Sequence, residues 1–285
     1  MAIMLSAPAA RAQEGAGLGA YFVTYSHQME ARGDMEIGIR TVSGFPHFRA
    51  APGLPASSAG NAFVGTSLEF EYGVRSWWTT EIYLDGQATA NENATFAGWR
   101  WENRVRPLRR EHWVNPVLYA EFEDINGSNR SLLGIVGHDG VDNFKTRADR
   151  AERKRELELR MILSSDFKGW NVAENFVAER NFSGRGADGS SWEFGYAVGA
   201  SRPVASKGKA ANFSLGAEAY GGLGDTDSLT LRQTAHYIAP TVDFKMPHGP
   251  RFSVSPGFGL NDHSNGMLLR VGVWYEIEDV FTRKR

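Results

Sequence analysis

Cysteine is absent from all 285 residues of the sequence. Its absence excludes disulfides, a thiol nucleophile and thiolate metal sites, and it is typical of exported proteins, which avoid oxidative mispairing. Long apolar runs are also missing, since no run approaches the roughly 20 residues that a membrane-spanning helix needs. Basic charge is not in excess either. The formal net charge is −2, so composition gives no support for nucleic acid as a partner.

What the sequence does contain is a two-residue alternation of apolar and polar or small side chains, repeated from Asp34 to Ile277. Alternate residues of a strand face opposite sides of a sheet. The repeated segments therefore predict one large antiparallel sheet with an apolar face and a polar face. Lipid covers such an apolar face when the sheet closes on itself in an outer membrane. We predict an all-β fold, a transmembrane antiparallel up-and-down β-barrel of about 12 strands, with about 14 strands as the alternative.

The alternation also predicts which side chains face outward. In the stretch Val64–Tyr72, Glu69 and Glu71 fall on the inner face, and the apolar side chains that alternate with them face lipid. In Ala94–Val105 we expect Ala97, Trp99 and Trp101 to face lipid. For Gly169–Glu179 either parity places an acidic residue or an asparagine against lipid, so no facing is assigned. Tryptophans near predicted strand ends, Trp274 among them, are expected in interfacial girdles.

The ends of the chain suggest processing and periplasmic placement. Ala10-Arg11-Ala12 has the form of a signal-peptidase site, so we interpret residues 1–12 as a signal-peptide remnant. The stretch Gly17–Glu30 looks strand-like, but one extra strand would make the count odd. We therefore expect an N-terminal periplasmic or lumen segment over 13–33, the barrel over 34–278 and a C-terminal periplasmic tail over 279–285.

Charged residues on the predicted inner face form the candidate site. Arg100, Glu102 and Arg104 lie on one face of a strand at steps of about 7 Å. Opposite Glu121 and Glu123 of the next strand, they are expected to form a charge ladder. The full predicted lumen cluster comprises Glu69, Glu71, Glu81, Arg100, Glu102, Arg104, Glu121, Glu123, Glu158, Arg160 and Arg270.

Three interpretations of this lumen remain open. The charges pair with one another, brace the wall and block flow, because isolated buried ions are costly. Alternatively, the lumen is a small water-filled pore whose surplus carboxylates favour cations. In the third interpretation the N-terminal segment plugs the lumen and opens on demand.

No catalytic residue, metal site or cofactor is expected. His263 and Ser264 are adjacent, so their side chains would diverge on a strand, and Asp262–Gly266 has the composition of a turn. An outer-membrane lipid hydrolase, which needs a base within reach of its nucleophile, is thus the least favoured alternative. The histidines show no ligand spacing that would indicate a metal site. We expect a protein that is not an enzyme.

Four stretches carry a resemblance to a known family: LEFEYGVRSWWTTEIYLDGQ, GWRWENRVRP, NPVLYAEFEDING and LLRVGVWYEIE. They resemble a family of bacterial outer-membrane barrels similar in layout to the outer-membrane proteins grouped around meta-pathway phenol degradation. The resemblance implies a pore or transporter for small solutes, including hydrophobic or aromatic ones, in the bacterial cell outer membrane. The expected partners are outer-membrane lipid and lipopolysaccharide, the barrel-assembly machinery and the solutes, with no nucleic acid.

Overall fold

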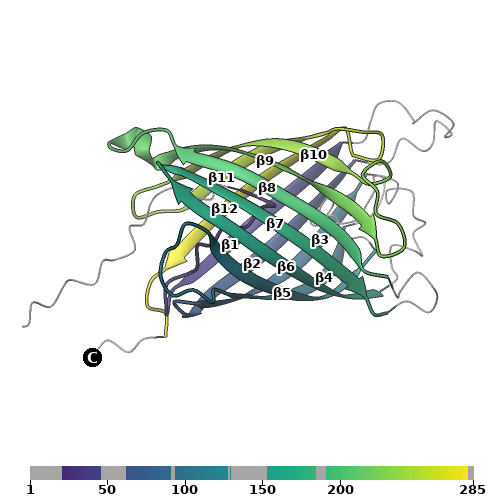
Figure 1. Ribbon diagram of the computed structural model, residues 1–285, viewed down its shortest axis with the longest axis horizontal. Coiled ribbons are helices and arrows are strands. Elements are labelled where there is room, and N and C mark those ends of the chain that lie inside the picture. The colour runs from purple at the N-terminus through teal and green to yellow at the C-terminus, as the bar shows by residue number, and fades with distance from the viewer. Residues whose placement is uncertain are drawn as a thin grey trace, which may run out of the picture.

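Twelve antiparallel strands form one closed barrel in the computed structural model, which describes residues 21–45, 62–90, 94–127, 129, 153–183 and 191–281 (Figure 1). The strands are β1 (Met35–Phe45), β2 (Phe63–Arg75), β3 (Trp78–Thr89), β4 (Thr95–Val105), β5 (Asn115–Asn126), β6 (Arg153–Phe167), β7 (Trp170–Asn181), β8 (Glu193–Pro203), β9 (Phe213–Asp225), β10 (His236–Lys245), β11 (Arg251–Gly259) and β12 (Met267–Ile277), with a 3-10 helix η4 (Lys209–Asn212) before β9. The predicted all-β barrel and its count of 12 strands are confirmed.

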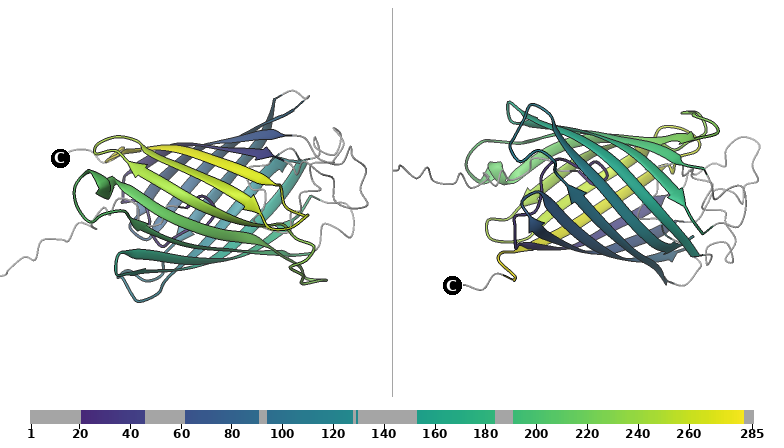
Figure 2. Two further views of the ribbon diagram at one scale, coloured as in Figure 1. Left: turned by 90° about the horizontal axis from the view of Figure 1, so that it is seen from above. Right: turned by 60° about the horizontal axis from the view of Figure 1, so that its bottom comes forward.

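The barrel closes through pairing of its first and last strands. Met35 lies opposite Ile277 and Phe45 opposite Met267, with unbroken register between them. Every other strand pairs with its sequence neighbours, so the described wall has no unpaired edge and no place for the alternative of 14 strands. The strands are tilted across the barrel wall in all views (Figures 1 and 2).

The connections are mostly short at one end of the barrel and longer at the other. Residues 76–77 and 168–169 are examples at the short-connection end, where β1 begins and β12 ends. Residues 127–152 form the longest connection, at the long-connection end. The predictions for residues 1–12, for residues 13–20 of the N-terminal segment and for residues 282–285 of the C-terminal tail fall outside the described residues.

The outer face of the barrel is apolar. Ile39, Ile82, Leu118, Leu215 and Val242 are each about half exposed, at 47 to 52 %. These side chains come from strands on all sides of the barrel, and no second layer of protein covers them in the part of the chain that the structure describes. None of the described residues belongs to a helix long and apolar enough to cross a membrane.

A β-bulge at Gly98 corrects one predicted facing. Gly98 lies opposite Asp85, but the next pair joins Phe96 to Gly86, so Ala97 has no partner on β3. The backbone at Gly98 has a φ of +142°, a value that residues other than glycine rarely adopt. The extra residue reverses the alternation. Ala97 therefore points inward at 2 % exposure, where we expected lipid contact, and Phe96 faces outward at 61 %.

The segment Gly169–Glu179, for which no facing was assigned, lies almost entirely in β7. Contacts inside the barrel explain which of its side chains face inward. Asn171 and Asn175 point inward, and Glu174 lies on the outer face between Val172 and Phe176. Asn175 hydrogen bonds with the backbone of Tyr25, inside the barrel. The strand thus places a carboxylate among apolar side chains because its asparagines are needed on the other face.

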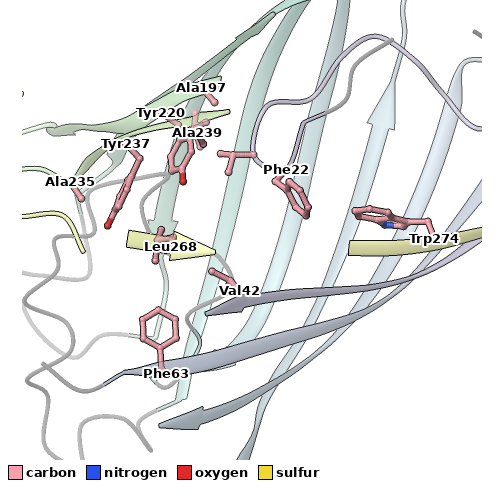
Figure 3. Close-up of a cluster of buried hydrophobic side chains, with 12 residues drawn as sticks. Phe22, Val42, Phe63, Ala197, Tyr220, Ala235, Tyr237, Ala239, Leu268 and Trp274 are labelled. Atoms are coloured by element: carbon pink, nitrogen blue, oxygen red, sulfur yellow. The ribbon is translucent and has the colours of Figure 1, made fainter. Parts of the chain in front are cut away.

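Trp274 also departs from the expected girdle. Its indole nitrogen donates a hydrogen bond to Glu69 Oε2 at 2.8 Å inside the barrel, and its ring lies 5.9 Å from that of Phe22. The alternation of β12 places Tyr275 outward and so requires Trp274 to face the lumen. Figure 3 shows Trp274 and Phe22 with other buried side chains, including Val42, Phe63, Tyr220, Tyr237 and Leu268.

Candidate functional site

Residues 21–33 run inside the barrel without regular secondary structure, and we call them the lumen segment. The segment meets the wall at the short-connection end, where the Gly33 amide donates to the carbonyl oxygen of Gly73 at 2.8 Å. From there it extends into the lumen, and Phe22, Val23, Thr24 and His27 are buried. Figure 2 shows this purple segment surrounded by the barrel wall.

Glu218 of β9 anchors the inner end of the lumen segment. Its carboxylate accepts hydrogen bonds from the amides of Phe22, Val23 and Thr24 at 3.1, 3.0 and 2.9 Å. It also accepts one from the Thr24 hydroxyl at 3.1 Å. A buried, irregular backbone needs partners for its amides. One carboxylate on the wall supplies them for three consecutive residues.

Tyr25 joins the lumen segment to strands β4, β6 and β7. Its amide donates to Asn175 Oδ1 at 2.7 Å, and the Asn175 amide donates to the Tyr25 carbonyl oxygen at 2.8 Å. Its hydroxyl donates to Glu102 Oε2 at 3.0 Å. The guanidinium groups of Arg104 and Arg160 lie 5.2 and 5.0 Å from its ring, within the range of cation–π attraction.

His27 attaches the lumen segment to β6. Its Nδ1 lies 2.9 Å from Ser164 Oγ, and its Nε2 lies 3.0 Å from Glu111 Oε2. This order of serine, histidine and acid resembles a hydrolytic triad. Ser164, however, is 1 % exposed, and its hydroxyl also accepts a hydrogen bond from the Asn171 amide. The geometry therefore fits a structural link better than a nucleophile that a substrate could reach.

The predicted His263–Ser264 pair lies in a turn between β11 and β12. Ser264 Oγ lies 2.8 Å from both the His236 carbonyl oxygen and Asn261 Oδ1, and its hydroxyl donates to one of these two acceptors. It also accepts a hydrogen bond from the His236 amide at 2.9 Å. These bonds hold the turn against β10.

Arg100 is the largest fully buried side chain of the predicted lumen cluster. It lies on β4 and joins two neighbouring strands, contacting Asp85 at 2.7 Å and Glu121 at 3.1 Å. Its guanidinium also stacks 3.9 Å from the centre of the Tyr83 ring. The arginine and both carboxylates are almost fully shielded from solvent.

Arg104 contacts carboxylates on β2, on β3 and on its own strand, and none on β5. It pairs with Glu71, with Glu102 at 2.7 Å and with Glu81 at 3.6 Å. Tyr119, not a carboxylate, lies opposite Arg104 on β5. Of the expected ladder between β4 and β5, the structure thus forms the contact of Arg100 with Glu121, whereas Arg104 turns toward β2 and β3.

Two further arginines join the wall to the lumen segment. Arg160 pairs with Glu158 and donates to the Val23 carbonyl oxygen at 3.0 Å. Arg40 pairs with Glu69 at 2.8 Å and donates to the Phe22 carbonyl oxygen at 3.0 Å. Arg270 of β12 donates to the Tyr220 hydroxyl.

The contacts of the lumen segment were not foreseen from the sequence. Several wall residues that hold this segment, such as Glu218 and Asn175, lie far from it in the chain. Glu218 and Val23, for example, are 195 positions apart. The one local sign of a segment inside the barrel was the strand-like run before Asp34, because a barrel with an even number of strands could not include it in the wall.

No family model and no curated protein matches this chain. Solved structures do match. An outer-membrane channel from Pseudomonas putida F1 is 12 % identical, with a TM-score of 0.58 over 88 % of this chain and 98 % of that chain. The NanC porin is 10 % identical, with a TM-score of 0.51 over 85 % of this chain and 100 % of that chain. The chain has the fold of a bacterial outer-membrane β-barrel.

The lumen segment is expected to be less firmly held at high pH. The pKa of Glu30, which precedes β1, is raised to about 9 by its burial and then by Glu71, Glu36 and Glu276. In the unfolded chain the group ionises near its ordinary value of 4.5. The folded state therefore binds the extra proton, and stability falls as pH rises from about 4.5 to 9.

Chemical unfolding of the barrel at a series of pH values across this window measures the effect. Glu30→Gln should flatten the dependence, since the amide does not ionise. Glu174→Gln, on the outer face, should leave it as in the wild type. An equal slope in the wild type and in Glu30→Gln would show that Glu30 is not its source.

Proposed function

We propose that this protein is a pore or transporter for small solutes in the bacterial outer membrane. The observation that supports this function best is the contrast between the two faces of the closed wall. The outer face is apolar, whereas the inner face carries the charged side chains of the lumen cluster. A lipid-facing barrel with a polar interior is the arrangement found in water-filled channels. The similar solved structures include a protein described as a channel and one described as a porin.

The solutes are proposed to be small cations or compact hydrophobic and aromatic compounds. Among the described residues that are buried, carboxylates outnumber arginines and lysines, and rings of acidic groups favour cations. The aromatic side chains of Phe22, Tyr25 and Trp274 in the lumen, together with the resemblance to the meta-pathway phenol family, support the second class. In this proposal the lumen segment narrows the passage, and its release widens it.

A second candidate function is a closed barrel with a structural or ligand-holding role. The pairing of Arg100 and Arg104 with carboxylates from several strands favours it, because such pairs brace a wall. Both candidates place lipid against the outer face and lipopolysaccharide around the long-connection end.

Conductance in planar bilayers distinguishes the two. A pore should give discrete current steps, and its reversal potential in a potassium chloride gradient should show a cation preference. Protein that is folded, as judged by circular dichroism and heat-modifiable mobility, but gives no current would contradict the pore and favour the closed barrel.

A further inference from the structure

Three buried carboxylates meet in the half of the lumen toward the long-connection end. Glu123 of β5, Glu158 of β6 and Glu179 of β7 come from three consecutive strands and point inward. One oxygen of each lies within 4.8 Å of the others. Glu158 and Glu179 are direct cross-strand partners, and Glu123 lies diagonally across from Glu158. We call these residues the three-glutamate site.

Glu123 is unsatisfied in this arrangement. Its exposure is 0 %, and neither of its carboxylate oxygens accepts a hydrogen bond from any residue that the structure describes. Arg100 lies directly opposite on β4, but its guanidinium contacts Asp85 and Glu121 instead. A buried carboxylate without a partner is strongly unfavourable. The site therefore needs positive charge from elsewhere.

Arg160, the arginine beside Glu158, already has other partners. Arg160 binds Glu158 through one nitrogen and the Val23 carbonyl oxygen through another. A second group of carboxylates, Glu30, Glu36 and Glu71, lies near the short-connection end. There the chain itself provides the counter-charges, because Arg104 pairs with Glu71 and Arg251 with Glu36. In the three-glutamate site, by contrast, Glu123 has no hydrogen-bond partner among the described residues for either carboxylate oxygen, and this carboxylate is the one that requires an external cation.

We propose that the three-glutamate site binds a divalent cation, and specifically Ca²⁺. Hard cations take oxygen ligands, and Ca²⁺ binds them at about 2.4 Å. Two ligand atoms that share such an ion are at most about 4.8 Å apart, a limit that all three carboxylates meet. Mg²⁺ usually takes one or two carboxylates and keeps several waters, so a site with three carboxylates fits Ca²⁺ better. Water from the lumen completes the coordination.

A bound Ca²⁺ would cross-link β5, β6 and β7 beside the long connection between β5 and β6. It would also neutralise part of the surplus acidic charge of the inner face. The proposal does not depend on the pore function, because ion binding can be measured on a barrel that conducts no current.

Titration of the full-length barrel in detergent, free of lipopolysaccharide, with calcium chloride tests the proposal. Isothermal calorimetry and equilibrium dialysis should find one saturable Ca²⁺ per chain. Glu123→Gln and Glu179→Gln should each weaken binding by about tenfold or more. Glu174→Gln is the matched control, since it removes a carboxylate from the outer face of the same strand as Glu179, and its Ca²⁺ binding should equal that of the wild type.

Thermal unfolding gives a second readout that a structural carboxylate would not produce. Ca²⁺ should raise the unfolding midpoint of the wild type. Glu123→Gln should raise the midpoint without Ca²⁺, because it removes the unpaired charge, and should abolish the further rise with Ca²⁺. Wild-type protein that binds no Ca²⁺, or Ca²⁺ binding that persists in both glutamine variants, would overturn the proposal. The wild-type titration alone decides the matter if a variant does not fold.

Discussion

Glu218→Ala is expected to raise the single-channel conductance several-fold and to make the open current noisier. The carboxylate of Glu218 accepts all the hydrogen bonds that hold Phe22, Val23 and Thr24 to β9. Hydrogen bonds to a charged group contribute about 1.5 to 3 kcal/mol each. Alanine would leave three backbone amides unpaired inside the lumen, and the inner end of the lumen segment would then exchange these contacts for water.

Recordings in planar bilayers, with matched protein amounts and salt, measure this change. Glu218→Gln keeps one acceptor oxygen and should give an intermediate conductance. Glu193→Ala removes an inward carboxylate from the neighbouring strand β8 without removing any contact of the lumen segment that the structure describes, and should conduct like the wild type. The fluorescence of Trp274, which packs against Phe22, reports release of the segment independently. Release seen by fluorescence without a rise in conductance would show that the segment does not limit flow.

Much of the barrel wall could be predicted from the sequence because its chemistry is local. The alternation in β2 and β3 places Glu69, Glu81 and Asp85 inward whatever the rest of the chain does, since two successive side chains cannot share a face. The same rule failed at Ala97, where the bulge at Gly98 adds a residue to one strand. A glycine is a weak signal for a bulge, so the reversal could be found only from the register.

The interior of the barrel was less accessible to such reasoning. Inward-facing charges were identified, but each has several candidate partners on two neighbouring strands and on the lumen segment. Arg104 illustrates this, because tilt and side-chain direction turn it toward Glu71 and Glu81 instead of β5. The position of Tyr25 depends on Asn175 and Glu102, which lie 150 and 77 positions away in the chain. Contacts of this kind form only when the barrel closes, so a local sequence pattern does not predict them.

Arg100→Met should destabilise the barrel by about 3 to 5 kcal/mol, the range measured when one partner of a buried ion pair is removed. The substitution keeps a long apolar side chain but leaves Asp85 and Glu121 buried without their counter-charge. Arg100→Lys should recover only part of the loss, because one ammonium cannot reproduce the fork with which the guanidinium contacts two strands and stacks on Tyr83.

Unfolding in urea, followed by tryptophan fluorescence in detergent, measures these free energies. The triple variant Arg100→Met, Asp85→Asn and Glu121→Gln removes the charges together and should regain most of the stability, because the penalty comes from the unpaired carboxylates and not from the missing arginine. Lys245→Met breaks a partly exposed pair with Glu276 and should cost about 0 to 1 kcal/mol. If Arg100→Met cost no more than Lys245→Met, water in the lumen would already screen Asp85 and Glu121. The centre of the barrel would then be wet enough to conduct ions, so the stability of this variant bears directly on the choice between an open and a closed lumen.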